Sequence, residues 1–213
     1  MKGHYMSNLL LINASPRQEN SRSRQLAESF IDKWSKENAD ATVVTRDVSP
    51  GNVNGPTQDW VEANFVPKDK RTDAQNELLA ESDEYISEIK AASHVVISTP
   101  LYNFSAPWNL KAYIDNLVRE GETFYYSVET SHGPLLEEGK KLLLIFTASG
   151  DYAPDAEFGQ YDVLTPTIAT AYGFMGLTDL SVIHCGNRAE APELKEASMT
   201  AALSRIDELS AVW

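Results

Sequence analysis

The sequence predicts an α/β protein with a doubly wound parallel sheet and helices on both of its faces. Five short apolar runs recur along the chain, and most are continuous rather than alternating, which is typical of strands covered on both sides. Segments with helical spacing separate these runs, and strand–helix alternation builds a right-handed parallel sheet. The predicted strands are Leu9–Asn13, Thr42–Asp47, His94–Thr99, Lys141–Thr147 and Thr178–Cys185.

The helices are predicted from apolar residues that recur every three or four positions. A proline favours the first turn of a helix, so Pro107 and Pro166 are each expected to open one. The apolar positions of the five predicted helices are Leu26, Phe30 and Trp34; Leu78, Ser82, Tyr85, Ile86 and Ile89; Leu110, Tyr113, Ile114, Leu117 and Val118; Ile168 and Tyr172; and, between about 193 and 209, Leu194, Ala197, Ala201 and Ile206.

Length and composition predict one domain over residues 1–213. A chain of this length buries a substantial core without crosslinks, and neither an internal repeat nor a long linker divides it. The formal charge of −13, with the acidic residues scattered, argues against binding to nucleic acid or to an anionic membrane surface. No apolar run is long enough to span a bilayer, and the start at Met1–Met6 lacks the apolar core of a signal peptide.

The cysteine and histidine content predicts neither a disulfide framework nor a metal site. Cys185 is the single cysteine, which is typical of a reducing compartment, and we therefore expect a cytoplasmic protein. The four histidines lack the spacing of metal ligands. A GxSxG nucleophile turn is also missing from the sequence, which disfavours hydrolysis.

The first candidate site segment follows the first strand and reads Asn13–Ser23. A phosphate at the start of the next helix would meet free backbone N–H groups and the hydroxyls of Ser15, Ser21 and Ser23, and Arg17 or Arg22 would add charge. The absence of GxGxxG and GxxxxGK[ST] disfavours a dinucleotide or P-loop site. Ser21 or Ser23 serving only as a helix N-cap is the alternative.

The second segment, Pro100–Trp108, follows the third strand and combines Tyr102 and Phe104 with Asn103. Aromatic side chains in such a turn pack against a flat ring, while its backbone groups bind the polar edge of that ring. A planar cofactor, above all a flavin, is therefore expected here. A third turn, Thr147–Gly150, follows the fourth strand, and its small residues allow close approach of a ligand.

The three turns together predict a binding site more strongly than any one of them alone. With a strand order of 2-1-3-4-5, the carboxyl ends of strands one, three and four converge on one crevice. Two further segments, Ser49–Thr72 and Gly121–Gly139, are longer than a minimal connection. Loops of that length are functional in some proteins and surface padding or subunit contacts in others.

The motif P-L-Y-N-F-S-A-P at Pro100–Pro107 resembles the FMN-dependent NADH-azoreductase and NAD(P)H:quinone oxidoreductase family, which has a flavodoxin-like fold. The resemblance covers nearly the whole chain. It continues in N-A-S-P-R-Q-E-N-S-R-S-R-Q-L at Asn13–Leu26, R-E-G-E-T-F-Y-Y at Arg119–Tyr126, G-P-L-L at Gly133–Leu136 and Y-G-F-M-G-L-T at Tyr172–Thr178.

The resemblance implies a role for each matching position. Ser15, Ser21, Arg22 and Ser23 match the FMN phosphate loop; Leu101, Tyr102, Asn103 and Phe104 match the turn around the isoalloxazine edge; Thr147, Ala148, Ser149 and Gly150 match the turn at the pyrimidine end; and Phe124, Tyr126 and Phe174 match aromatic residues of the substrate pocket. In the third turn this chain departs from the family pattern, which has an Arg or a second Gly, so contacts there are expected from backbone.

The implied activity is an FMN-dependent, NAD(P)H-using reductase of quinones and azo compounds. Hydride would pass through the flavin N5 in a ping-pong sequence, with no acid–base side chain assigned. The resemblance also implies a homodimer with sites at the subunit interface. Two alternatives stay open: a flavodoxin-type electron carrier without its own NAD(P)H reductase activity, and a flavin-free protein that binds a phosphorylated ligand or serves in an assembly. The sequence does not separate NADH from NADPH.

Overall fold

The computed structural model describes residues 8–129, 131–187 and 189–213, so the start at Met1–Met6 lies outside the described residues. A five-stranded parallel sheet forms its centre, in the order β2-β1-β3-β6-β7. Since β4 and β5 pair separately, this is the order 2-1-3-4-5 of the chain's main strands, and the predicted fold class is confirmed. The strands are β1 Asn8–Asn13, β2 Thr42–Asp47, β3 His94–Pro100, β6 Lys141–Thr147 and β7 Asp179–Cys185.

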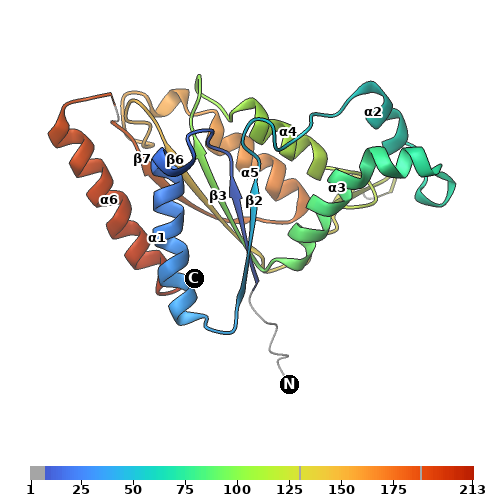
Figure 1. Ribbon diagram of the computed structural model, residues 1–213, viewed down its shortest axis with the longest axis horizontal. Coiled ribbons are helices and arrows are strands. Elements are labelled where there is room, and N and C mark those ends of the chain that lie inside the picture. The colour runs from blue at the N-terminus through green and yellow to red at the C-terminus, as the bar shows by residue number, and fades with distance from the viewer. Residues whose placement is uncertain (1–7, 130, 188) are drawn as a thin grey trace.

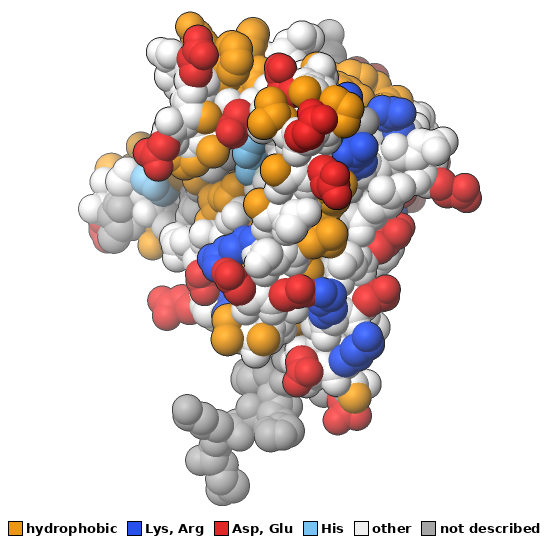
Figure 2. Space-filling view, turned by 90° about the vertical axis from the view of Figure 1, so that its left-hand side faces the viewer, with side chains coloured by type: hydrophobic (Ala, Val, Ile, Leu, Met, Phe, Trp, Pro, Cys, Tyr) orange, Lys and Arg blue, Asp and Glu red, His pale blue; other side chains and the backbone are white. Residues whose placement is uncertain are grey.

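Helices cover both faces of the sheet, as Figure 1 shows. On one face lie α1 (Arg22–Glu37) and α6 (Pro192–Ser210). On the other lie α3 (Asp73–Ala91), α4 (Trp108–Leu117) and α5 (Leu164–Met175), with the short α2 (Gln58–Asn64) beside α3. The face that carries α6 shows acidic side chains scattered among basic ones (Figure 2).

Each face has its own core because successive strand residues point to opposite sides. Leu10 and Ile12 of β1 pack on the side of α3, α4 and α5. Leu9 and Leu11 pack with α1 and α6, where Trp34 is fully buried. Burial of one such side chain contributes roughly 1.5–3 kcal/mol to stability. The two cores together therefore hold the sheet and its helices in place.

The structure corrects the predicted helices in three places. The buried face of α6 carries Ala202, Ile206 and Leu209, whereas the predicted Leu194 is 48% exposed, because scattered alanines left the phase of this helix ambiguous. In α3 the buried leucine is Leu79 rather than Leu78. Pro166 lies two residues inside α5, which begins at Leu164.

The two long connections both contain regular structure. Ser49–Thr72 includes α2 and a short 3₁₀ turn at Lys68–Lys70. Gly121–Gly139 forms a hairpin of β4 (Phe124–Ser127) and β5 (Ser131–Pro134), which bond to each other and not to the main sheet. Among the described residues, no helix has the length and apolar character needed to cross a bilayer.

Candidate functional site

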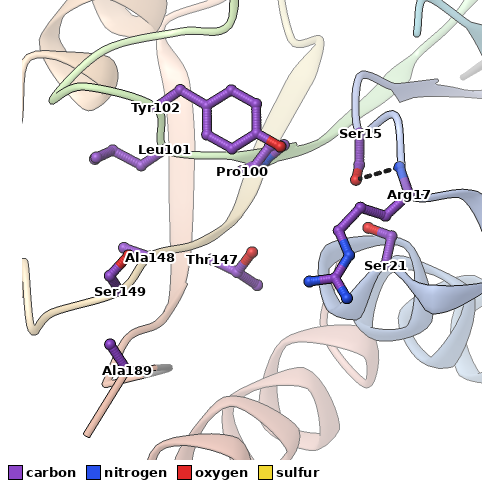
Figure 3. Close-up of a pocket in the computed structure, with 10 residues that line it drawn as sticks. All are labelled: Ser15, Arg17, Ser21, Pro100, Leu101, Tyr102, Thr147, Ala148, Ser149 and Ala189. Carbon is purple, nitrogen blue, oxygen red and sulfur yellow. Dashed lines mark hydrogen bonds between the residues drawn. The ribbon is translucent and has the colours of Figure 1, made fainter.

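Three turns at the carboxyl edge of the sheet enclose a cavity of about 280 Å³. Figure 3 shows the turn after β1 on one side, the turn after β3 above, and the turn after β6 opposite. The convergence predicted from the strand order is therefore present. The lining residues are Ser15, Arg17, Ser21, Pro100, Leu101, Tyr102, Thr147, Ala148, Ser149 and Ala189.

The first turn brings hydrogen-bond donors to the start of α1. Ser21 is the N-cap of this helix, and its Oγ accepts a hydrogen bond from the Arg24 backbone N–H at 3.4 Å. Ser23 Oγ lies 3.1 Å from Ser21 Oγ, and the hydrogen bond between them holds the capping hydroxyl in place. The first amides of a helix lack partners within it, and the helix dipole adds partial positive charge, so this end suits an anion.

A buried arginine holds the first turn in shape. Arg24 is 8% exposed, and its Nη2 donates to the Ser15 carbonyl at 2.8 Å and to Asp47 Oδ1 at 2.9 Å. Burial alone would raise the pKa of Asp47, but the hydrogen bonds from Arg24 and Ser49 outweigh it and hold that pKa at about 2. Arg24 was not among the predicted site residues; its signal is an arginine on the apolar face of a helix, three residues before Ala27.

The second turn is strained at two consecutive residues. Asn103 and Phe104 have φ angles of 47° and 72°, and Tyr102 and Ser105 exchange backbone hydrogen bonds of 3.1 and 3.0 Å. Two positive φ angles of this kind define a type I′ turn, which prefers Asn and Gly. A non-glycine residue there costs about 1–3 kcal/mol, and such strain is concentrated at functional sites. The Val163 N–H donates to the Phe104 carbonyl at 2.9 Å, which anchors the turn to the start of α5.

The third turn is braced by the segment that follows β7. The Asn187 N–H donates to the Gly150 carbonyl and the Ala189 N–H to the Ser149 carbonyl, both at 3.1 Å. Gly186 is required here, because a Cβ on it would lie 2.5 Å from the Gly150 oxygen. Ala189 therefore enters the cavity lining through backbone pairing, for which the sequence carries no chemical signal.

A histidine supports the far side of this turn. Burial lowers the pKa of His184, against the raising effect of Asp151, whose Oδ1 lies 3.6 Å from His184 Nδ1. The Tyr152 N–H points at His184 Nε2 at 3.5 Å, so the neutral ring serves as an acceptor for the chain that leaves the turn.

The predicted site residues fall into three groups. Seven line the cavity: Ser15, Ser21, Leu101, Tyr102, Thr147, Ala148 and Ser149. Arg22, Ser23, Asn103, Phe104 and Gly150 stand next to it in the same three turns but do not line it. Phe124 and Phe174 lie outside the lining, in contact with each other at 4.8 Å between ring centroids, and Phe174 stacks on His132 at 4.6 Å. Tyr126 is 65% exposed on β4.

The chemistry of the cavity suits a flat ring with a phosphate tail. Hydroxyls of Ser15 and Ser21, the Arg17 side chain and helix amides gather at one end, which fits a phosphate monoester. At the other end Ala148 and Ala189 are small, so a planar group can approach the backbone closely. In the described residues, no group of three or more His, Cys, Asp or Glu is arranged to hold a metal ion.

Comparison with known proteins agrees with this geometry. A family model described as a flavodoxin-like fold matches residues 7–209. The FMN-dependent NADH:quinone oxidoreductase 8 of Burkholderia lata is 37% identical, over 91% of this chain and 89% of that protein. An FMN-dependent NADH:quinone oxidoreductase of Nostoc sp. is 34% identical over 98% of this chain and 100% of its own length. The crystal structure of an azoreductase from Bacillus anthracis superposes with a TM-score of 0.87 at 25% identity, covering 98% of this chain and 100% of that one. The chain therefore belongs to the flavodoxin-like family, and within it to the FMN-dependent NADH:quinone oxidoreductases.

Proposed function

We propose that this protein is an FMN-dependent NAD(P)H:acceptor oxidoreductase that transfers two electrons to quinones and azo compounds. The observation that carries the proposal is the cavity bordered by three turns, with phosphate-binding chemistry at one end and the small residues Ala148 and Ala189 at the other. The named activity of the relatives supports it. FMN, when bound, supplies the chemistry of accepting a hydride and passing on two electrons.

The phosphate end is assigned to the turn after β1. Ser15, Ser21 and Arg17 would bind the phosphate with side-chain donors, and Arg22 and Ser23 with the free amides at the start of α1. The Arg24–Asp47 pair positions the Ser15 carbonyl, so these donors are in place before the ligand arrives. Preorganised donors bind more tightly because no loop has to be ordered on binding.

The ring end is assigned to the two other turns. Leu101, Tyr102, Asn103 and Phe104 would bind one edge of the ring through main chain, and Thr147, Ala148, Ser149 and Gly150 the pyrimidine edge. N–H groups at that edge stabilise negative charge on a reduced ring. No side chain of this chain is assigned as an acid or a base, and water would supply protons.

The protein is further proposed to form a homodimer in which Phe124, Tyr126 and Phe174 line the substrate pocket. Large apolar side chains outside the cavity lining are open to solvent: Phe65 is 77%, Trp108 61% and Val128 94% exposed. Exposed apolar side chains mark a protein–protein interface where they form one contiguous patch. Sedimentation equilibrium should give twice the 23.6 kDa chain mass, and a single-chain mass at micromolar concentration would contradict this.

The reducing compartment expected from Cys185 would be the cytoplasm.

The function is tested with the purified protein. It should be yellow, lose its flavin absorption on anaerobic addition of NADH, and oxidise NADH steadily with menadione or a model azo dye. Parallel lines in double-reciprocal plots would support the ping-pong sequence. Colourless protein that stays colourless after incubation with FMN would contradict the proposal, and flavin that NADH fails to reduce would favour an electron carrier instead.

A further inference from the structure

A buried asparagine connects the first and second turns of the cavity. Asn109 lies in the first turn of α4, two residues after Pro107 at the end of the second turn, and is 1% exposed. Its side-chain amide has two hydrogens, and Nδ2 donates to the Ala14 carbonyl at 2.8 Å and to the Val48 carbonyl at 2.7 Å. Ala14 follows β1 and Val48 follows β2. One side chain therefore joins the ends of two strands to the helix that leaves the second turn.

The Ala14 carbonyl is the point at which the hydrogen-bond ladder between β1 and β3 stops. The Ala14 N–H donates to the Ser98 carbonyl at 2.9 Å, so in a regular parallel ladder the N–H two residues beyond Ser98 would donate to the Ala14 carbonyl. That residue is Pro100, which has no N–H. Because Ala14 is fully buried, its carbonyl would stay unpaired without another donor, at a cost of about 1–3 kcal/mol. Asn109 supplies that donor.

The ladder between β1 and β2 stops at the same level. The Val48 N–H donates to the Asn13 carbonyl at 2.8 Å, and the next rung of a parallel ladder would run from the Ser15 N–H to the Val48 carbonyl. Asn109 binds that carbonyl instead, and within the described chain the Ser15 N–H makes no hydrogen bond. Ser15 therefore leaves the sheet directly after Ala14, and it lines the cavity.

The first turn is held from both faces of the sheet. Arg24 of α1 binds the Ser15 carbonyl from one face, and Asn109 of α4 binds the preceding carbonyl, that of Ala14, from the other (Figure 1). Each peptide unit is planar, so holding two successive carbonyls constrains the backbone of Ser15 between them. Since α4 follows directly from the second turn, Asn109 also constrains how far the first turn lies from the second.

We propose that Asn109 is a positioning residue for the cofactor, which holds Ser15 at the phosphate end of the cavity at a fixed spacing from the turn that binds the flavin ring. This inference rests on the proposed function, because it concerns how the same cavity holds FMN. Asn109 is not among the residues that line the cavity, so it acts through Ser15. Loss of its amide should therefore affect ligands that carry the phosphate more than ligands that lack it.

Fluorescence titration of cofactor-free Asn109→Ala with FMN and with riboflavin tests this inference. Compared with the parent protein, FMN should bind about tenfold more weakly, which is the effect of roughly one lost hydrogen bond, whereas the affinity for riboflavin should change less than about threefold. Riboflavin has the same ring and lacks the phosphate. A structural role alone would weaken both ligands by the same factor.

The matched control is Asn116→Ala. Asn116 lies on the same helix, is 2% exposed, and its Nδ2 also donates to two carbonyls, those of Asn54 and Ala112, both at 2.9 Å. Neither carbonyl belongs to a turn that lines the cavity. The control should lower the free energy of unfolding much as Asn109→Ala does and leave the ratio of the FMN and riboflavin affinities unchanged.

A second substitution tests the Ala14 carbonyl directly. In the Asn109→Ala background, Pro100→Ala restores an N–H at the position where the ladder lacks one. It should recover the affinity for FMN relative to riboflavin by about threefold, which is part of one hydrogen bond. In the parent protein, where Asn109 already binds the Ala14 carbonyl, Pro100→Ala should bring no such gain.

Three results would overturn the inference: equal weakening of FMN and riboflavin in Asn109→Ala, the same change of their ratio in Asn116→Ala, or an equal effect of Pro100→Ala in both backgrounds. If Asn109→Ala does not fold, Asn109→Ser, which is small and keeps one donor, is judged by the same ratio. Failure of the unmodified protein to bind FMN would contradict the proposed function instead.

Discussion

The polar residues of the site fall into those that face the cavity and those that hold others in place. Ser15 and Ser21 line the cavity, whereas Arg24 and Ser23 act on them from within the protein. Most buried polar groups are hydrogen-bonded, because an unpaired one costs about 1–3 kcal/mol. The supporting residues are therefore expected to affect stability first and cofactor affinity through it.

Asp47→Asn tests the ion pair that holds the first turn. The folded pKa of about 2 lies below the unfolded value of about 3.9, so the stabilisation is present above pH 4 and is lost as the pH falls toward 2. Since the Asp47 side chain is 31% exposed, solvent screening reduces the expected loss at pH 7 to about 1 kcal/mol. Urea denaturation at pH 7, 5 and 3 should show the variant and the parent protein converging. A difference that stays constant down to pH 3 would contradict this assignment.

Two substitutions of Phe104 test the backbone strain in the second turn, and both remove the aromatic ring. Phe104→Gly should leave the free energy of unfolding within about 1 kcal/mol of the parent, because relief of strain at φ 72° offsets the entropy lost by glycine. Phe104→Val should be less stable than the glycine variant by about 1–2 kcal/mol, because a β-branched residue tolerates positive φ poorly. Chemical denaturation of both measures the difference, and equal stabilities would show that the turn relaxes.

At the scale of elements, strands rather than helices define the site. β1, β3 and β6 each end in a turn that lines the cavity, and the segment after β7 braces the third turn. α1 contributes its amino-terminal end, and α5 anchors the Phe104 carbonyl through Val163. A change in the brace after β7 should therefore reach the cavity without touching the core.

Gly186→Ala tests that brace. A Cβ at this position would lie 2.5 Å from the Gly150 oxygen and 2.7 Å from the His184 ring, so the third turn must move. We expect FMN to bind about tenfold more weakly, since shifted backbone loses roughly one hydrogen bond's worth of affinity. Gly173→Ala in α5 is the control: its Cβ would meet nothing within 4 Å, and it should stabilise the helix by about 1 kcal/mol. Fluorescence titration measures the FMN affinity of both variants. Equal FMN affinity in Gly186→Ala and the parent protein would show that the segment after β7 does not act on the cofactor site.

At the scale of the whole molecule, the features that follow from the apolar pattern of the sequence were predicted. Those that follow from backbone hydrogen bonds were not. Continuous apolar runs such as His94–Thr99 predicted the parallel sheet, and the strand order of a flavodoxin-like fold then predicted the edge where Ser15, Tyr102 and Ser149 meet. Ala189 was missed because its place comes from a backbone hydrogen bond that leaves no mark on residue type. The phase of α6 was wrong because its alanines fit either face.

The cofactor's contribution to the whole molecule tests the assignment of the cavity ends. A ligand that binds only the folded state stabilises it by RT ln(1 + [L]/Kd), which is about 2.7 kcal/mol at 100 times Kd. For a chain of 213 residues this corresponds to a rise in Tm of about 5–10 °C when FMN is added to cofactor-free protein. Riboflavin has the same ring without the phosphate, so it should raise Tm by much less, and Ser15→Ala/Ser21→Ala should reduce the difference between the two ligands. Scanning calorimetry measures each shift. If riboflavin stabilises the unmodified protein as much as FMN does, the donors at the start of α1 do not bind the phosphate.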